Sequence, residues 1–405
     1  MEIDNIDKAR KKINLELEGR LAENKKNYYF QLSSFKSHLS IKEHYVSDGN
    51  SSTSLDDVYD LGNKSETIFT SINRKVIGKM KFDNDKQLKT INGIKINYNK
   101  FKDCIFANVR FKNCTFYGTV FSSCTFKDVA FENCYFSKSA KDIVVFNDKS
   151  TFINSYFKNC NIENSIFKDV DIKDTKFILS SLKNTILSDV DIKNMHVSDC
   201  DWRSLKIMNP KIETLEFEDN FLTKFNEDTF LDKIKINKKN KKSYEYAFKV
   251  YRDVSRKFEA NGLLNSSGQY YYLSKLMEQK LLKGIEKIKS YIFWMLCGYG
   301  ERPTYALITS IEVVLFFTIT YMFTGLNVEG YSINYRILFI SGLPIESLIS
   351  DFMKSLYFSI VTFTTVGYGD ITPVGYSVLL SGLEMFLGVT MVGVWTATLA
   401  RKITR

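Results

Sequence analysis

A large apolar residue recurs at every fifth position through the middle of the chain, and this spacing limits the fold more than any other feature. An α-helix repeats about every 3.6 residues and a strand every two, so a period of five fits neither. A solenoid whose short edges each turn a corner accommodates it. The large residues are Ile91, Ile96, Phe101, Phe106, Phe111, Phe116, Phe121, Phe126, Phe131 and Phe136, and then Phe152, Phe157, Ile162, Phe167, Ile172, Phe177, Leu182, Leu187, Ile192, Val197, Trp202, Ile207, Ile212 and Phe217.

A smaller residue stands two positions before each large one, for example Cys104, Val109 and Cys114. This pattern resembles the pentapeptide-repeat family, and the resemblance implies a right-handed quadrilateral β-helix over residues 91–220. Both positions of each repeat then point inward, and four repeats make a coil, so we expect six coils. Asp or Asn often follows the large residue by two, as at Asp103 and Asn108, where many family members have Gly.

The register moves by one residue between Phe136 and Phe152. Fifteen residues would preserve the five-residue period, but sixteen separate these two positions. We therefore expect a bulge or short loop that leaves the coil within residues 137–151.

The cysteines and charges of the solenoid raise two further functional hypotheses, a metal site and DNA mimicry. Cys104 and Cys124 would stack on one face, as would Cys114 and Cys134, but they are spaced by ten with no CxxC pair, which favours small buried residues over metal ligands. Some pentapeptide-repeat proteins resemble DNA, which requires an acidic surface. Residues 91–220 contain 18 Lys and Arg against 17 Asp and Glu, so we expect no DNA mimicry and no nucleic-acid partner.

Two apolar stretches near the C-terminus, residues 305–324 and 376–399, are long enough to cross a bilayer, which takes about 20 residues. Lysines and Arg302 precede the first stretch, and Arg401, Lys402 and Arg405 follow the second. By the positive-inside rule both termini are cytoplasmic. We expect a multi-pass protein of the plasma membrane in contact with lipid, with its cysteines reduced.

The remaining segments complete a four-part division into residues 1–90, 91–220, 221–302 and 303–405. Residues 1–27 are expected to be helical, 47–57 to form a loop, and 58–90 are ambiguous. The lysine-rich stretch 232–246 is either a solvated connector or a contact with the anionic leaflet. A helix with Ala247, Val250, Tyr251, Val254 and Phe258 on one face, and a second from Ser267 towards Trp294, predict a helical hairpin.

The sequence TTVGYGD at residues 364–370 lies between the two apolar stretches. It follows DFMKSLYFSIVTF, a segment of residues 351–363 that is too short to span a membrane. Non-helical backbone at membrane depth is tolerated only where it is buried in protein or lines an aqueous path.

This arrangement resembles potassium channels of the two-transmembrane-helix type, with an outer helix, a pore helix, a TVGYG filter and an inner helix in an all-α membrane pore domain. The resemblance implies a homotetramer in which backbone carbonyls replace the water shell of K⁺. K⁺ is then the permeant ion and no cofactor is expected. The ion-binding residues carried over are Thr365, Val366, Gly367, Tyr368 and Gly369, with Asp370 at the outer mouth.

Several positions depart from that family or stay open. Where some members have a pore-helix glutamate, this chain has Val361, so inactivation behaviour does not carry over. Tyr357 replaces a tryptophan, and its hydroxyl either bonds Asp370 or lies at a wet interface. Gly388 and Gly393 are either hinge residues or close-packing positions.

Two carboxylates within the apolar stretches and a second glycine motif also need an explanation. Glu312 and Glu384 are expected to face protein or water rather than lipid. The second GYG motif, residues 298–300, lacks the preceding Thr-Val and is assigned to a turn.

No enzyme constellation is found, because His38, His44 and His196 are isolated and no HExxH or P-loop occurs. We predict a potassium channel that is not an enzyme.

The chain ends at Arg405, so we expect gating input from the N-terminal side, through the hairpin to the outer helix or to Arg401 and Lys402. An unknown protein or ligand could bind the solenoid. The alternative is a membrane-anchored pentapeptide-repeat scaffold for protein partners with a vestigial or non-selective pore.

Overall fold

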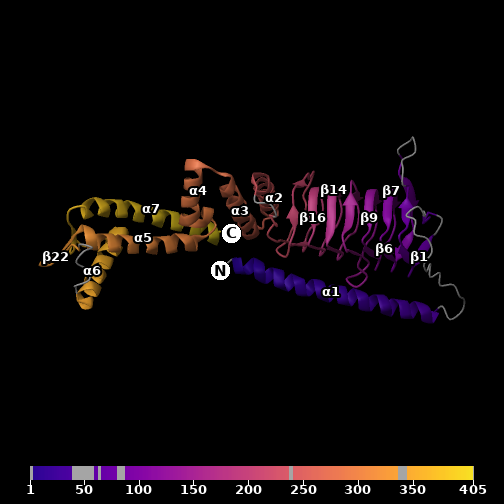
Figure 1. Ribbon diagram of the computed structural model, residues 1–405, viewed down its shortest axis with the longest axis horizontal. Helices are drawn as coiled ribbons and strands as arrows, with labels where there is room; N and C mark the ends of the chain where they lie inside the picture. The colour runs from indigo at the N-terminus through magenta and orange to yellow at the C-terminus, as the bar shows by residue number, and fades with distance from the viewer. Residues whose placement is uncertain are drawn as a thin grey trace. The chain divides into compact units, whose positions relative to one another are not determined.

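The computed structural model describes residues 3–38, 59–62, 65–79, 87–236, 240–335 and 344–404. The chain forms two compact units, residues 1–277 and 278–405. The loop expected at residues 47–57 lies outside the described residues. The helices are α1 (Ile3–His38), α2 (Lys241–Ala260), α3 (Leu264–Leu281), α4 (Gly284–Cys297), the 3-10 turn η1 (Gly298–Gly300), α5 (Pro303–Thr324), α6 (Ile345–Phe363) and α7 (Ser377–Ile403) (Figure 1).

Short parallel strands stacked in four columns make the first unit a β-solenoid, as the five-residue period predicts (Figure 1). One side is an eight-stranded sheet, β2 (Ser71–Asn73), β6 (Lys100–Lys102), β8 (Val120–Ser122), β10 (Val145–Asn147), β13 (Ile166–Lys168), β15 (Ile186–Ser188), β17 (Lys206–Met208) and β20 (Phe230–Leu231). Two further sides form a ten-stranded sheet, β3 (Val76–Gly78), β4 (Lys89–Asn92), β7 (Ile105–Lys112), β9 (Thr125–Glu132), β11 (Ser150–Ile153), β12 (Tyr156–Lys158), β14 (Val170–Ile178), β16 (Asp191–Ser198), β18 (Lys211–Ile212) and β19 (Leu215–Phe217). The fourth side holds β1 (Glu66–Ile68), β5 (Lys95–Asn97) and single bridges from Lys95 to Lys224.

Solenoid strands lie beyond both expected limits, residues 91 and 220. Strand β2 pairs with β6 before residue 91, and β20 pairs with β17 after residue 220. The reason is that Thr67, Ile72 and Ile77 continue the five-residue spacing upstream, on inward-facing positions. The solenoid therefore makes about seven turns rather than six.

Stacked aromatic rings fill the interior. Each Phe column repeats ring on ring, for example Phe106 on Phe126 at 4.6 Å between centroids and Phe157 on Phe177 at 4.8 Å. All seven cysteines are free and buried, and the solenoid thiols donate to backbone carbonyls, as Cys114 does to Lys112. This placement supports the prediction of small buried residues and gives those thiols hydrogen bonds of their own.

The Asp and Asn residues at the corners explain how the chain turns without glycine. Asp103, Asn108, Asn113 and Asn133 all have φ between 51° and 55°, a left-handed conformation that Asn and Asp tolerate best after Gly. Their side chains also join neighbouring coils, since the Asn133 amide donates to the Asn113 oxygen at 3.2 Å. Asp and Asn at these positions, where many family members have Gly, therefore still allow the chain to turn the corner.

A loop leaves the coil within residues 137–151, as predicted, but the one-residue shift in register lies after that loop. Residues 137–142 leave the coil in a turn, closed by the Ser137 hydroxyl and the Asp142 amide, which both donate to the Ser139 carbonyl. The chain then returns at Phe146, which is stacked between Phe121 and Phe167. Phe146 pairs with Phe121, 25 residues earlier, and Phe152 pairs with Phe126, 26 residues earlier. The extra residue therefore lies between Phe146 and Phe152, where Asp148 and Lys149 both have a positive φ.

Helix α1 lies along the eight-stranded side of the solenoid (Figure 1). Ile13 and Leu17 pack against an outward apolar stripe that includes Val145 and Ile186. At one end Arg10 donates two 2.6 Å hydrogen bonds to the fully buried carboxylate of Asp232. The helix expected over residues 1–27 is therefore confirmed and extends to His38.

Helices α2 and α3 cover the last coils. The predicted face of α2 is buried, and the hydroxyls of Tyr251 and Tyr270 accept hydrogen bonds from the amides of Ile234 and Leu231. The single helix predicted from Ser267 towards Trp294 is wrong, because the chain breaks between α3 and α4. Helix α3 ends at Leu281 and α4 begins at Gly284, whose φ of 55° allows the chain to change direction.

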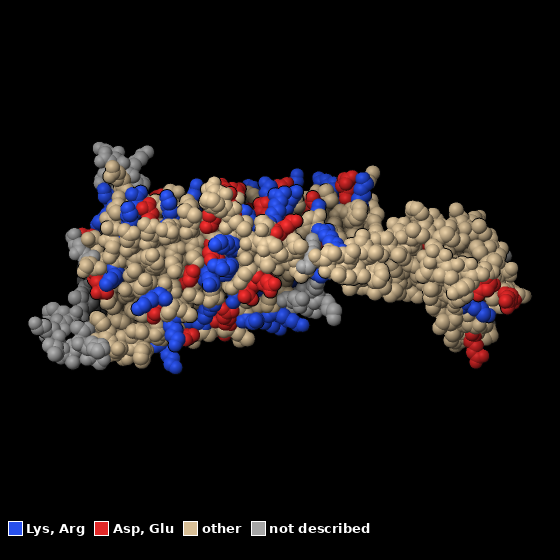
Figure 2. All heavy atoms as spheres, turned by 180° about the vertical axis from the view of Figure 1, so that it is seen from behind, with Lys and Arg blue, Asp and Glu red and all other residues tan. Residues whose placement is uncertain are grey.

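The second unit is helical, with a small antiparallel sheet of β21 (Leu326–Val328), β22 (Tyr331–Ile333) and β23 (Thr372–Pro373). Helices α5 and α7 are long and apolar enough to cross a membrane, as predicted. Helix α6 starts six residues before the predicted pore helix. Figure 2 shows that the visible face of this unit is almost free of charged groups except at one end.

Replacing Phe146 by alanine tests whether the aromatic stack stabilises the solenoid. The change removes a fully buried ring that contacts five other rings, so we expect it to lower the free energy of unfolding by about 3–5 kcal/mol. Urea unfolding followed by far-UV circular dichroism measures this. Tyr135→Ala, at a half-exposed position, is the control with little expected change; equal effects of the two variants would contradict the stacking account.

Candidate ion-conduction site

Three helices meet at one buried carboxylate in the second unit. Glu384 of α7 accepts hydrogen bonds from the hydroxyls of Tyr321 on α5, at 2.7 Å, and Ser359 on α6. The Ser359 hydroxyl also lies 2.9 Å from the Val314 carbonyl of α5. Glu384 thus faces protein, as expected, and it ties the short helix α6 to both membrane helices. Glu312, in contrast, is exposed on the single chain.

The backbone after α6 alternates in the sign of φ. Thr365, Gly367 and Gly369 have φ of 61°, 59° and 81°, while Val366 and Tyr368 are outside the positive region. In an ordinary strand successive carbonyls point to opposite sides. Alternation between left-handed and right-handed conformations instead turns successive carbonyls to one side, and glycine at two of the three positive positions lowers its cost.

The end of α6 holds this segment through its main chain. The Val361 carbonyl accepts the amides of Val366 at 3.0 Å and Gly367 at 3.4 Å. Among the described residues, none donates a hydrogen bond to the carbonyls of Thr365, Val366, Gly367 or Tyr368. Residues 364–370 are all exposed on the single chain. Four successive carbonyls are therefore free to bind something else.

Two contacts support the segment on its far side. The Tyr357 and Asp370 side chains line one hollow and lie close enough to interact, and a hydrogen bond between them stays a prediction. Directly afterwards, Thr372 and Pro373 pair with Asn327 and Leu326 in the small sheet. No sequence pattern predicted this sheet, which joins the end of α5 to the residues that follow the glycine motif.

Gly388 and Gly393 lie in very different surroundings. A Cβ on Gly388 would come within 1.9 Å of the Phe363 carbonyl oxygen, so the inner helix touches the end of α6 directly at this point. A Cβ on Gly393 would meet nothing within 4 Å. The contact of Gly388 matches the close-packing alternative, and α7 is one continuous helix through both positions.

The second glycine motif forms the predicted turn, with positive φ at Gly298, Tyr299 and Gly300. The Tyr299 hydroxyl bonds Gln279 of α3 at 3.0 Å and Ser290 of α4 at 2.7 Å. Immediately after the turn, the buried carboxylate of Glu301 pairs with the Arg401 guanidinium at 3.1 Å. The turn therefore connects the start of α5 to the end of α7. From sequence, Arg401 is an expected contact of the hairpin, but Glu301 is not predicted as its partner.

A family comparison identifies this arrangement. Residues 308–405 match the model of the family described as ion channel. The C-terminal unit carries an ion-channel domain. Residues 64–187 match a second model, described as the SV2A/B/C luminal domain. No curated protein matches the chain.

Solved structures similar to this chain include QnrB1, a plasmid-mediated fluoroquinolone resistance protein. A trypsin-treated variant is 14% identical with a TM-score of 0.18 and covers 38% of this chain and 89% of its own. Full-length QnrB1 is 11% identical with a TM-score of 0.14 and covers 42% and 93%. The ion-channel assignment rests on the family match and the two membrane-length helices, and the fold of the repeat domain on its strand pairing.

Replacing Gly388 by alanine tests the contact between the inner helix and α6. The Cβ has to displace the Phe363 backbone just before the glycine motif, so we expect the channel to lose most of its ion flux. Gly393→Ala is the matched control on the same helix, with flux close to that of the unchanged protein. Flux assays in liposomes and a check of the assembly by native mass spectrometry measure both variants. Equal flux from the two variants would contradict a packing role.

Proposed function

We propose that the protein is a potassium-selective channel in which four chains assemble around one axis. The observation that carries this proposal is the segment 365–368, whose four carbonyls have no donor among the described residues and whose φ values alternate in sign. Stacked rings of such carbonyls replace the hydration shell of K⁺ in selectivity filters. The permeant K⁺ is the ligand, and the mechanism needs no cofactor.

The exposure of this segment supports the proposed homotetramer. In a single chain Val366 and Tyr368 are 53% and 72% exposed, at the depth where a membrane offers no water to backbone groups. Copies arranged around an axis would enclose the segment and let each chain contribute one carbonyl per ring. Gly369 and Asp370 would then form the outer mouth, with Tyr357 holding Asp370 in place.

Location follows from the charges at the membrane helices. Arg401 and Lys402 at the end of α7, and the lysines before α5, favour the cytoplasmic side for both termini. The plasma membrane is the expected location. The solenoid would then lie in the reducing cytosol, in agreement with its free cysteines.

Reversal potentials test selectivity. The unchanged protein in liposomes or planar bilayers under mixed K⁺ and Na⁺ gradients is expected to prefer K⁺ and to be blocked by Ba²⁺. Gly367→Ala should abolish conduction but keep the tetramer, because a Cβ at a φ of 59° is strained and does not touch the helices.

Gly330→Ala is the matched control, since Gly330 also has a positive φ, 87°, in the turn between β21 and β22. It should conduct normally. Equal permeability for K⁺ and Na⁺ would contradict a selective filter and would favour the scaffold alternative.

We further propose that the N-terminal part modulates gating through α4. In the chain, α4 follows the helices that cover the solenoid. It packs on both α5 and α7, with the Thr309 hydroxyl donating to the Met295 carbonyl at 2.9 Å. The Glu301–Arg401 pair connects the same region to the end of the inner helix. A displacement of α4 would therefore act on both membrane helices and shift the open and closed populations.

Charge reversal at Glu301 tests this route. Glu301→Lys places like charges at a buried contact, so the open probability should change several-fold while the K⁺ to Na⁺ permeability ratio stays the same. Single-channel recording measures both quantities. The double change Glu301→Lys with Arg401→Glu should restore part of the original open probability.

Lys402→Glu is the control, because Lys402 is an exposed neighbour of Arg401 with no ion pair to reverse among the described residues. The same shift in this control would point to surface charge instead of the Glu301–Arg401 contact. An unchanged open probability in Glu301→Lys would show that the Glu301–Arg401 contact takes no part in gating.

A further inference from the structure

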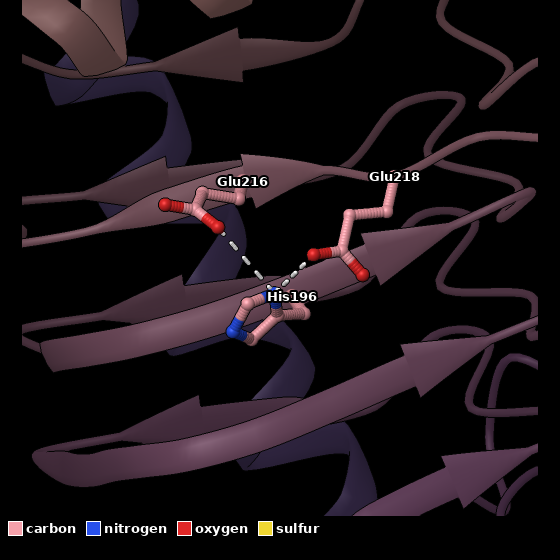
Figure 3. Close-up of side chains that lie close together, drawn as sticks. All are labelled: His196, Glu216 and Glu218. Carbon is pink, nitrogen blue, oxygen red and sulfur yellow. Dashed lines mark hydrogen bonds and ion pairs between the residues drawn. The ribbon is translucent and has the colours of Figure 1, made fainter.

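His196 is not isolated, contrary to the expectation from sequence. It lies on β16 in register with Glu216 of β19, and Glu218 follows two residues later on the same outward face (Figure 3). The His196 Nδ1 atom is 3.0 Å from the Glu218 carboxylate and 3.6 Å from that of Glu216. One donor atom from each residue falls within 4.8 Å of the other two. The group could not be recognised from sequence, because about twenty residues, one coil of the solenoid, separate His196 from the two glutamates.

The solenoid fixes these positions. Residues 216 and 218 alternate with the inward Phe217, so both carboxylates stand on the outer face on either side of the imidazole. The strand ladder continues to Glu218, whose amide donates to the Val197 carbonyl at 2.8 Å. The His196 side chain is only 19% exposed, which limits its freedom further. The group is therefore arranged before any ligand arrives.

Charges of both signs lie beside the imidazole, because Lys176 of β14 pairs in register with His196 on one side and Glu216 of β19 on the other. Both carboxylates direct an oxygen at the same ring nitrogen, which can donate a single hydrogen bond. A cation between Glu216 and Glu218 would offset the repulsion between their two carboxylates.

We propose that His196, Glu216 and Glu218 form a binding site for a divalent transition-metal ion of the Zn²⁺ class. Such an ion binds an imidazole nitrogen and carboxylate oxygens at about 2.0–2.2 Å, which places neighbouring donors about 3–3.5 Å apart. The distances from Nδ1, 3.0 and 3.6 Å, fit this requirement. The nitrogen donor disfavours Mg²⁺ and Ca²⁺, which prefer oxygen. Water would complete the coordination.

The site joins the last coils next to α2. Helix α2 packs on β18 and β19, and Lys257 of α2 pairs with Asp219 at 2.6 Å, one residue after Glu218. An ion that bridges β16 and β19 would hold the strand on which α2 rests. The ion would thus stabilise the folded end of the solenoid, by linkage, in proportion to its affinity.

Zinc titration of the full-length protein without a histidine tag tests the proposal. Isothermal titration calorimetry should give one Zn²⁺ per chain at this site, and Zn²⁺ should raise the melting temperature of the solenoid. His196→Ala and Glu218→Gln should each remove this binding and the shift. Co²⁺ should give a visible absorption band in the unchanged protein that His196→Ala lacks.

Glu213→Gln is the matched control. Glu213 is also a surface carboxylate next to β16, but it pairs with Lys193 at 3.7 Å and has no imidazole partner. This variant should bind Zn²⁺ as the unchanged protein does. If His196→Ala misfolds, Glu218→Gln carries the test, because Glu218 is 60% exposed and its loss leaves no cavity.

Equal Zn²⁺ binding by the unchanged protein, His196→Ala and Glu218→Gln would overturn the site. Tighter binding of Mg²⁺ or Ca²⁺ than of Zn²⁺ would overturn the class of ion. Neither result would bear on ion conduction, which is measured separately.

Discussion

The carbonyls of residues 365–368, which accept no hydrogen bond from the part of the chain that the structure describes, set the requirements for the rest of the pore unit. Carbonyls that are buried or at membrane depth need a hydrogen-bond donor or a cation as a partner. In an ion channel, the dehydrated permeant cation can be that partner. The Val361 carbonyl holds the segment at its base, and the small sheet holds it beyond Gly369. The short helix α6 must in turn be fixed, which the hydroxyls around Glu384 and the close contact of Gly388 accomplish.

The two units use opposite ways of satisfying the backbone. In the solenoid each strand bonds the strands of the coils above and below it, so the interior needs only stacked rings such as Phe106 and Phe126 and small thiols. Left-handed Asn and Asp residues absorb the strain at the corners. In the pore unit the helices satisfy their own backbone, and the segment proposed to bind the ion is a short irregular stretch between α6 and α7.

Regular features were predictable from sequence, and long-range side-chain contacts were not. The five-residue period gave the solenoid, and length with apolarity gave α5 and α7, because each pattern reports one local repeat. The extra coils before Ile91 were missed since Thr67 is polar and an insertion interrupts the count. Glu384 with Tyr321 and His196 with Glu216 join residues far apart in sequence, and no spacing rule connects them. The break at Gly284 was missed because the apolar pattern continues across it.

The most direct measurement of the central claim is the structure of the assembled protein in a lipid environment with Tl⁺ in place of K⁺, using the anomalous signal of Tl⁺. The account predicts four chains around one axis, with Tl⁺ in a line between rings formed by the carbonyls of residues 365–368, and with Tl⁺ lost when Na⁺ replaces it. Carbonyls that point away from a common axis, or an assembly without four-fold symmetry, would contradict the account.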